Sequence, residues 1–220
     1  MIELRDVSVK HNDIDALVGV SASIRPGTVT ALAGPNGSGK STLLAVIAGV
    51  QAHRGTVARD RTPHAGRGRD ARIAFVVQRS AVPPTLPVTV RDVVSMGRWS
   101  ERGRWRPLTR ADRAIVTDSI HSLGLDGLER RPLHALSGGQ RQRALVAQGL
   151  AQRADVLLLD EPTVGLDDEA QLLIGIAIAA EADRGVTVVH ATHDPAVIAT
   201  ADRVIRLDAG RLVSPEPGSR

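Results

Sequence analysis

Hydrophobic and polar residues alternate at two places near the amino end of the chain, over residues 2–9 and residues 18–24. Alternation with a period of two is typical of strands in a sheet that buries one face. We therefore predict two strands here. A polar turn at residues 11–13 would lie between them, and the Pro26–Gly27 pair would form a turn after the second.

Apolar runs occur at residues 28–33, 156–159 and 186–189, within strands that we predict at 28–33, 155–160 and 186–191. Such runs are expected for the central strands of a parallel sheet that is covered by helices on both faces. The other elements that we predict outside the middle of the chain are strands at 55–59, 72–77, 203–208 and 211–213 and helices at 41–49, 168–183 and 195–200.

The middle of the chain has a different character. Residues 79–87 carry three prolines, and helical patterns follow near 89–98, 109–123 and 139–152. Thr109, with Asp112 three residues later, is expected to cap the second of these helices. The fold class is therefore α/β, with a core of mainly parallel sheet and flanking helices, strands at the amino end and a helical insertion. We expect one domain over residues 1–220, in which 1–78 and 155–213 form the core, 79–154 the insertion and 214–220 a tail.

Composition excludes several classes of protein. The chain has 220 residues and no cysteine, so disulfides and thiol chemistry are excluded. The 28 basic residues are interspersed with 24 acidic ones, and with one Phe and no Tyr there are few rings for stacking on bases, so no nucleic acid partner is expected. No secretory signal begins the sequence, and the longest apolar run, 172–180, is far shorter than a membrane span. We expect a soluble protein located in the cytoplasm.

A phosphate-binding loop is the clearest chemical motif. It fits the pattern of Gly, four residues, Gly, Lys and Ser, between an apolar strand and a helix. Glycines let several backbone N–H groups converge on a polyphosphate, and the helix N-terminus favours negative charge. Lys40 is expected to reach the β- and γ-phosphates of ATP and Ser41 to ligate Mg²⁺. The alternative is a Gly-rich turn without a ligand. The nucleotide-binding residues that we predict here are Gly34, Pro35, Asn36, Gly37, Ser38, Gly39, Lys40, Ser41 and Thr42.

Two acids follow the apolar strand that ends at residue 160. Ligand sites of open α/β sheets gather at the carboxyl ends of strands. Asp160 could hold Mg²⁺ there, and Glu161 could polarise an attacking water. The alternative is an acidic turn that Pro162 terminates.

A second anion-binding element is predicted at Ser137, Gly138, Gly139 and Gln140. Ser137 is a good N-cap, and the glycines expose the first N–H groups of a helix. One nucleotide does not require two such elements, and a simple capped helix start is the alternative. His193, after the strand at 186–191, would lie beside the γ-phosphate. His190 and His193 could instead bind a metal, but no third ligand stands at a usable spacing.

Taken together, these motifs resemble the nucleotide-binding subunits of ATP-binding-cassette (ABC) transporters, over about residues 2–213. The Leu-Ser-Gly-Gly-Gln element that ends at Gln140 is the specific part, because other phosphate-loop proteins lack it. The resemblance implies an α/β fold with a P-loop NTPase core, an N-terminal antiparallel β subdomain and a helical insertion. It implies that Glu161 is the catalytic carboxylate and that His193 contacts the γ-phosphate. It also implies that Gln78 links Mg²⁺ and water to the membrane partner, and that Asp167 acts across a dimer interface.

One position departs from the family pattern. Many relatives have an aromatic residue, often Tyr, that stacks on adenine, and here that position holds His11. A neutral imidazole can also stack, with a smaller contact area. We therefore expect His11 to contact adenine, with weaker or pH-sensitive affinity.

The segments at 77–98 and 108–112 are similar to those of zinc and manganese importers, which implies uptake of a divalent metal. The resemblance further implies a homodimer or pseudo-dimer that binds integral membrane permease subunits at the cytoplasmic face of the membrane, together with an extracytoplasmic solute-binding protein. The alternatives are an importer or exporter of another substrate and a soluble ABC ATPase. A small-molecule kinase would not use the second anion-binding element.

Overall fold

The computed structural model describes residues 1–59, 71–77, 87–103 and 105–213. Predictions for Gln78, for most of the proline-rich stretch and for the tail at 214–220 lie outside these residues. In the described part, one sheet has the strand order β5-β6-β7-β3-β8-β9, parallel except for the β8–β9 pair. Its strands are β3 (Val29–Ala33), β5 (Ile73–Val76), β6 (Val156–Asp160), β7 (Thr187–Thr192), β8 (Arg203–Asp208) and β9 (Arg211–Leu212).

A separate antiparallel sheet contains the amino end of the chain, as the alternating pattern predicts. Its order is β2-β1-β4, formed by β1 (Ile2–His11), β2 (Ile14–Ile24) and β4 (Arg54–Arg59). The second strand begins four residues earlier than predicted. The reason is that Asn12 and Asp13 both adopt a positive φ, 44° and 67°, which closes a tight two-residue turn. His11 consequently belongs to β1 and pairs with Ile14, so it is not part of the turn.

The predicted helices are present in the described residues, with one exception in detail. The helices are α1 (Lys40–Ala48), α2 (Val90–Met96), α3 (Trp99–Arg102), α4 (Arg110–His121), α5 (Gly138–Ala151), α6 (Asp168–Asp183) and α7 (Pro195–Thr200), with a 3₁₀ turn at Leu133–Ala135. The helix that we predicted near 89–98 ends at Met96, and α3 follows it. Gly97, a poor helix former, stands at this boundary, where a Cβ would lie 2.5 Å from the carbonyl oxygen of Gln148.

The register of the parallel strands determines where the residues after β3, β6 and β7 lie. Asp160 at the end of β6 pairs with Ala191, and Ala33 at the end of β3 pairs with Thr192. The strands β6 and β7 are buried at every position, as their apolar sequences predict. The residues that follow these three strands therefore meet at one edge of the sheet.

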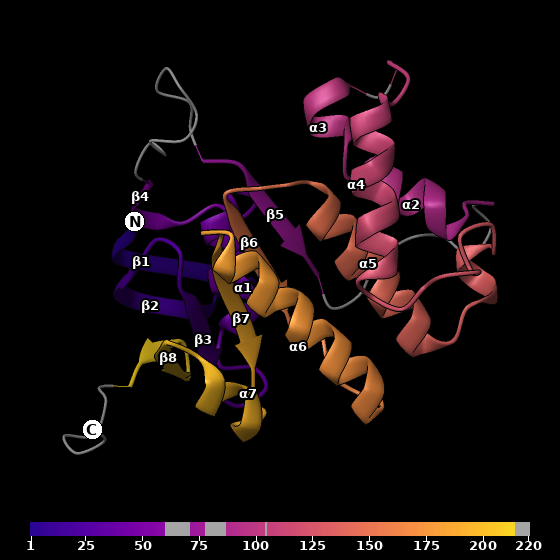
Figure 1. Ribbon diagram of the computed structural model, residues 1–220. Coiled ribbons are helices and arrows are strands. Elements are labelled where there is room, and N and C mark those ends of the chain that lie inside the picture. The colour runs from indigo at the N-terminus through magenta and orange to yellow at the C-terminus, as the bar shows by residue number, and fades with distance from the viewer. Residues whose placement is uncertain (60–70, 78–86, 104, 214–220) are drawn as a thin grey trace.

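The helices α2, α4 and α5 of the helical insertion pack together, and their hydrophobic core is continuous with buried residues of β5, β6, β7 and α6. Figure 1 shows the insertion on one side of the molecule, with the antiparallel sheet on the other and α6 between them. The predicted cap of α4 is confirmed, because the Thr109 hydroxyl accepts a hydrogen bond from the Asp112 N–H at 3.2 Å. Arg98 and Arg102 donate to the Asp112 carboxylate at 3.0 and 2.9 Å. Hydrogen bonds, above all the one from the Thr109 hydroxyl, hold the pKa of the buried Asp112 carboxyl well below its usual range.

Candidate functional site

The loop between β3 and α1 can form only with glycine at two of its positions. Gly34 has a φ of 155°, and a Cβ there would lie 2.2 Å from the Leu207 carbonyl oxygen. Gly39, the residue before α1, has a φ of 99°, and its Cβ would lie 2.6 Å from the Ala16 carbonyl oxygen. These contacts are too short for any side chain, so backbone from β2 and β8 closes tightly around the loop. The amino end of α1 follows directly.

Lys40 is buried, with 4% of its surface exposed, and its ammonium group lies over the loop. Its Nζ donates to the carbonyl oxygens of Gly34 at 2.8 Å and Pro35 at 3.1 Å. The same nitrogen lies 3.2 Å from Oε1 of Glu161. This ion pair joins the phosphate loop to the end of β6, and an incoming anion can compete with the carboxylate for the lysine charge.

Ser41 and Asp160 also connect these two elements. The Ser41 hydroxyl donates to Oδ1 of Asp160 at 3.0 Å. The pKa of the Asp160 carboxyl is raised above its usual value, mainly by burial and also by the neighbouring Glu161 charge. The hydrogen bond from Ser41 and the charge of Lys40 act in the opposite direction. A hydroxyl and a carboxylate oxygen are hard donors, which suit Mg²⁺.

Glu161 has an unusual backbone for a residue that is not glycine, with a φ of 47°. Its N–H donates to the Ala191 carbonyl oxygen at 3.0 Å, which fixes this conformation against β7. The side chain is 9% exposed, and its Oε1 lies 3.6 Å from Nδ1 of His193. Strained backbone of this kind is concentrated at functional sites. The structure thus brings Lys40, Glu161 and His193 together, as three separate sequence motifs predicted.

A pocket of about 420 Å³ opens at Lys40 and Glu161, and neither His193 nor Asp160 is among its lining residues. Ala16 of β2 lines it, although no motif in the sequence singles out this alanine. His11 does not line it and is exposed at the end of β1. Gly34, Pro35 and Ser38 belong to the loop but are not in the lining. The lining residues are Ala16, Asn36, Gly37, Gly39, Lys40, Ser41, Thr42 and Glu161.

The residues of the second predicted anion-binding element are not among those that line this pocket. The Ser137 hydroxyl accepts from the Gln140 N–H at 3.2 Å, and the Gln140 amide oxygen accepts from the Ser137 N–H at 3.1 Å. Ser137 and Gly138 are exposed, and none of the four residues from Ser137 to Gln140 lines the pocket. Asp167 caps α6 by accepting from the Ala170 N–H at 2.8 Å. It does not line the pocket either.

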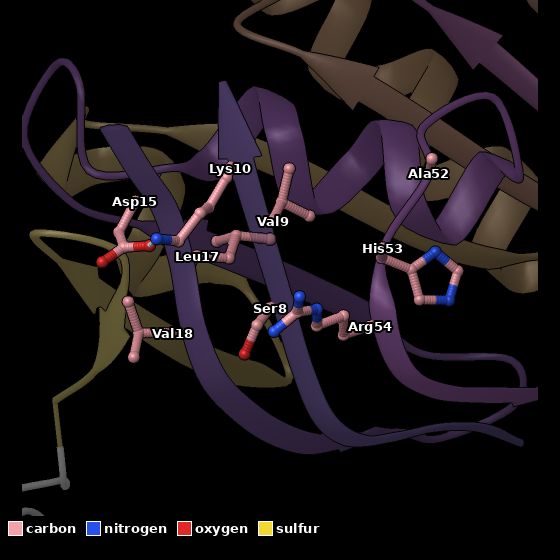
Figure 2. A pocket seen from close by; sticks show the side chains of 9 residues that line it. All are labelled: Ser8, Val9, Lys10, Asp15, Leu17, Val18, Ala52, His53 and Arg54. Atoms are coloured by element: carbon pink, nitrogen blue, oxygen red, sulfur yellow. Dashed lines mark ion pairs between the residues drawn. The ribbon is translucent and has the colours of Figure 1, made fainter. Parts of the chain in front are cut away.

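Another pocket, of about 450 Å³, lies on the antiparallel sheet and the segment before β4 (Figure 2). It is largely apolar, and Lys10 is paired with Asp15 across its rim at 3.5 Å. It contains none of the residues that we predicted to act on a nucleotide. Its lining residues are Ser8, Val9, Lys10, Asp15, Leu17, Val18, Ala52, His53 and Arg54.

The two histidines of β7 and its loop differ in environment. His190 is 3% exposed and its Nε2 has no hydrogen-bond partner among the described residues, whereas the His193 side chain is 51% exposed. Within the described part of the chain, no group of three or more His, Asp or Glu side chains is placed to hold a metal ion. The arrangement therefore gives no support to the alternative of a histidine metal site.

His190 should make stability depend on pH. Burial lowers its pKa from 6.5 to about 4, although Asp194 and Glu161 act in the opposite direction. Between these pH values the unfolded chain binds a proton that the folded protein does not, so the free energy of unfolding falls as pH falls. From pH 7.5 to 5 we expect His190 to contribute a loss of about 2 kcal/mol. Urea unfolding of wild type and His190→Gln at both pH values measures it, and an equal loss in both proteins would contradict it.

The parallel sheet, the phosphate loop at the carboxyl end of β3 and the acids at the end of β6 define a P-loop nucleotide-binding protein. Residues 17–164 match the model of the ABC transporter family. The manganese transport system ATP-binding protein MntA of Synechocystis sp. is 38% identical, over 94% of this chain and 81% of that protein. The zinc import ATP-binding protein ZnuC of Alkalilimnicola ehrlichii is 34% identical, over 97% of this chain and 76% of that protein.

A solved structure supports the same family. The dimeric post-hydrolysis structure of an ATP-binding cassette, bound to ADP and Pi, superposes with a TM-score of 0.82 at 28% identity, covering 96% of each chain. The chain therefore belongs to the ABC transporter family. It is an ATP-hydrolysing subunit of such a transporter, which confirms the fold class and the activity inferred from the sequence. No helix in the described ranges is both long and apolar enough to cross a membrane.

Proposed function

We propose that this chain energises the import of a divalent transition metal, manganese or zinc. The observation that carries the proposal is similarity over almost the whole chain to ATP-binding proteins named for manganese transport and zinc import. The residues at 77–98 and 108–112, which first indicated these importers, lie largely in the helical insertion. Hydrolysis itself takes place at the cluster of Lys40, Glu161 and His193.

In the proposed reaction, the loop N–H groups and Lys40 hold the β- and γ-phosphates of ATP. When Lys40 turns toward the phosphates, its ion pair with Glu161 at 3.2 Å is released. The free carboxylate then accepts a proton from a water molecule as the water oxygen attacks the γ-phosphorus and the bond to ADP breaks. His193, which reaches Glu161 from the end of β7, orients that water and the γ-phosphate.

Ser41, Asp160 and Gln78 would hold Mg²⁺. The hydrogen bond of 3.0 Å between Ser41 and Asp160 supports this, since it places two oxygen donors of the right chemistry at the loop. When bound, the ion neutralises charge on the β- and γ-phosphates. Gln78 enters the proposal from the sequence, because it lies outside the described residues.

Two subunits would complete each nucleotide site. Ser137, Gly138, Gly139, Gln140 and Asp167 do not line the pocket of their own chain, which supports action on the ATP of the opposing subunit. The backbone N–H groups of Gly138 and Gly139 at the start of α5 would hold the γ-phosphate from the other side. We further propose that His11 stacks on the adenine ring.

Closure of this dimer would drive separate membrane permease subunits from the cytoplasmic face of the membrane, and an extracytoplasmic solute-binding protein would deliver the metal. The test is uptake of radioactive manganese and zinc by a deletion strain that carries either the wild-type gene or Glu161→Gln. We expect uptake of one metal to be restored only by the wild type. Uptake of both metals that is independent of the gene would instead assign another substrate, for which hemin is a candidate because a hemin import protein of Rhodococcus jostii is 35% identical.

A further inference from the structure

The tryptophans of this chain are concentrated at one place. The sequence contains two Trp, one Phe and no Tyr, and both Trp lie in the stretch 98–113. Trp99 begins α3 and is 44% exposed, and Trp105 precedes α4 and is 85% exposed. Trp is a large and mostly apolar side chain, and it is seldom left so exposed unless a partner covers it.

The same stretch holds the excess positive charge of the protein. It contains six arginines and two acids, an excess of four positive charges, which equals the formal charge of +4 of the entire chain. Both acids pair with other arginines: the buried Asp112 binds Arg98 and Arg102, and the exposed Glu101 pairs with Arg98 and with Arg72. Neither acid forms an ion pair with the other arginines of this stretch that the structure describes.

Among the described residues of this stretch, three arginines are exposed and unpaired with either acid. Arg106, Arg110 and Arg113 are exposed, and none of them has an ion pair with another residue that the structure describes. Arg110 and Arg113 are three residues apart on α4, so they share one face of the helix, while Asp112 is buried beneath it. The contact of Arg102 with Asp112, at 2.9 Å, holds α3 against the start of α4.

We propose that this tryptophan–arginine surface, formed by Trp99, Trp105, Arg106, Arg110 and Arg113, binds the headgroups of anionic phospholipids. Indole rings favour the boundary between headgroups and acyl chains, and each arginine near an anionic membrane strengthens binding about fivefold. Figure 1 shows α3 and the amino end of α4 together at one end of the helical insertion, away from α1.

A flat lipid surface suits this patch better than a peptide does. Peptide segments dock in grooves, and the five side chains line neither the nucleotide pocket nor the pocket of Figure 2. The surface binds lipid without a permease and without ATP. Its test therefore stands apart from the test of metal import.

The chain carries its own probe for this contact. In Trp99→Phe, Trp105 is the single tryptophan, and its fluorescence reports on the patch alone. Vesicles of phosphatidylglycerol and phosphatidylcholine should shift its emission to shorter wavelength at low salt, vesicles of phosphatidylcholine should not, and 0.5 M salt should reverse the shift. An emission that is unchanged by anionic vesicles would overturn the proposal.

Charge removal then locates the contact. The triple variant of Arg106, Arg110 and Arg113 to Gln should co-sediment with anionic vesicles roughly 100-fold more weakly than wild type. The matched control changes three other exposed arginines, Arg25, Arg206 and Arg211, to Gln and should still bind.

Three outcomes overturn the lipid assignment. One is equal loss of binding in both triple variants, which would mean that net charge alone acts. Another is no loss in either variant. The third is binding that appears only when permease subunits are present in the vesicles, which would assign the surface to a protein partner. ATP affinity of the triple patch variant should equal that of wild type, which shows that it folds.

Discussion

Glu161→Gln is expected to hydrolyse ATP about 10² to 10⁴ times more slowly than the wild-type protein while still binding ATP. Glutamine has nearly the same size and can keep the position beside Lys40 and His193, but it cannot accept a proton from the attacking water. Since the nucleotide would no longer be consumed, ATP-bound dimer should accumulate. Phosphate release measures the first effect, and size-exclusion chromatography with ATP measures the second.

The control for this experiment is Glu129→Gln, a change of the same chemistry in the helical insertion, far in sequence from the loop. It should hydrolyse ATP at the wild-type rate. If Glu161→Gln kept full activity, the carboxylate would not be the base, and the proposed reaction would be wrong. If the variant lost activity without binding ATP, the residue would act in binding.

Lys40→Ala should weaken ATP binding roughly 10- to 100-fold, as titration calorimetry can measure. Hydrogen bonds to a charged group contribute about 1.5–3 kcal/mol each, and Lys40 supplies the positive charge at the loop. Removal of Lys40 should weaken ATP binding in a second way. Glu161, which is 9% exposed and 3.2 Å from the lysine nitrogen, would face the phosphates with its negative charge uncompensated by Lys40.

The sequence offers a precise control, because Lys10 is the one other lysine in the chain. It lies on the antiparallel sheet, 3.5 Å from Asp15, outside the nucleotide pocket. Lys10→Ala changes the net charge equally and should leave ATP affinity unchanged. Equal losses in the two variants would show that overall charge, and not the position of Lys40, determines binding.

Much of the fold followed from local signals. Apolar runs predicted β6 and β7 as buried central strands, and the Thr109 and Asp112 pair predicted the start of α4. The start of β2 was missed because the alternation in sequence stops near Val18, whereas strand pairing continues to Ile14. Pairing of strands joins residues across a turn, and a pattern within one segment does not reveal it.

Some residues of the candidate site could likewise be predicted from the sequence, and others could not. Side chains with distinctive chemistry, such as Lys40, Glu161 and His193, could be selected from sequence because nucleotide chemistry uses groups of these kinds, and the structure places Lys40 and His193 beside Glu161. Ala16 was not, because its contribution is the shape of a backbone that approaches Gly39. The left-handed conformation of Glu161 was also hidden, since it depends on the contact of its N–H with β7.

The helical insertion leaves the sheet after β5 and returns at β6, and these two strands are neighbours. At the return point, Asp155 accepts from the Arg72 N–H at 2.8 Å and donates its own N–H to the Arg72 carbonyl oxygen at 2.9 Å. The strand to which this long excursion returns is thus fastened to the start of β5, the strand from which it leaves. Substitutions within the insertion can therefore change the surface that meets a membrane partner, while Lys40 and Glu161 keep their spacing. The fold thus allows partner recognition and ATP hydrolysis to vary separately.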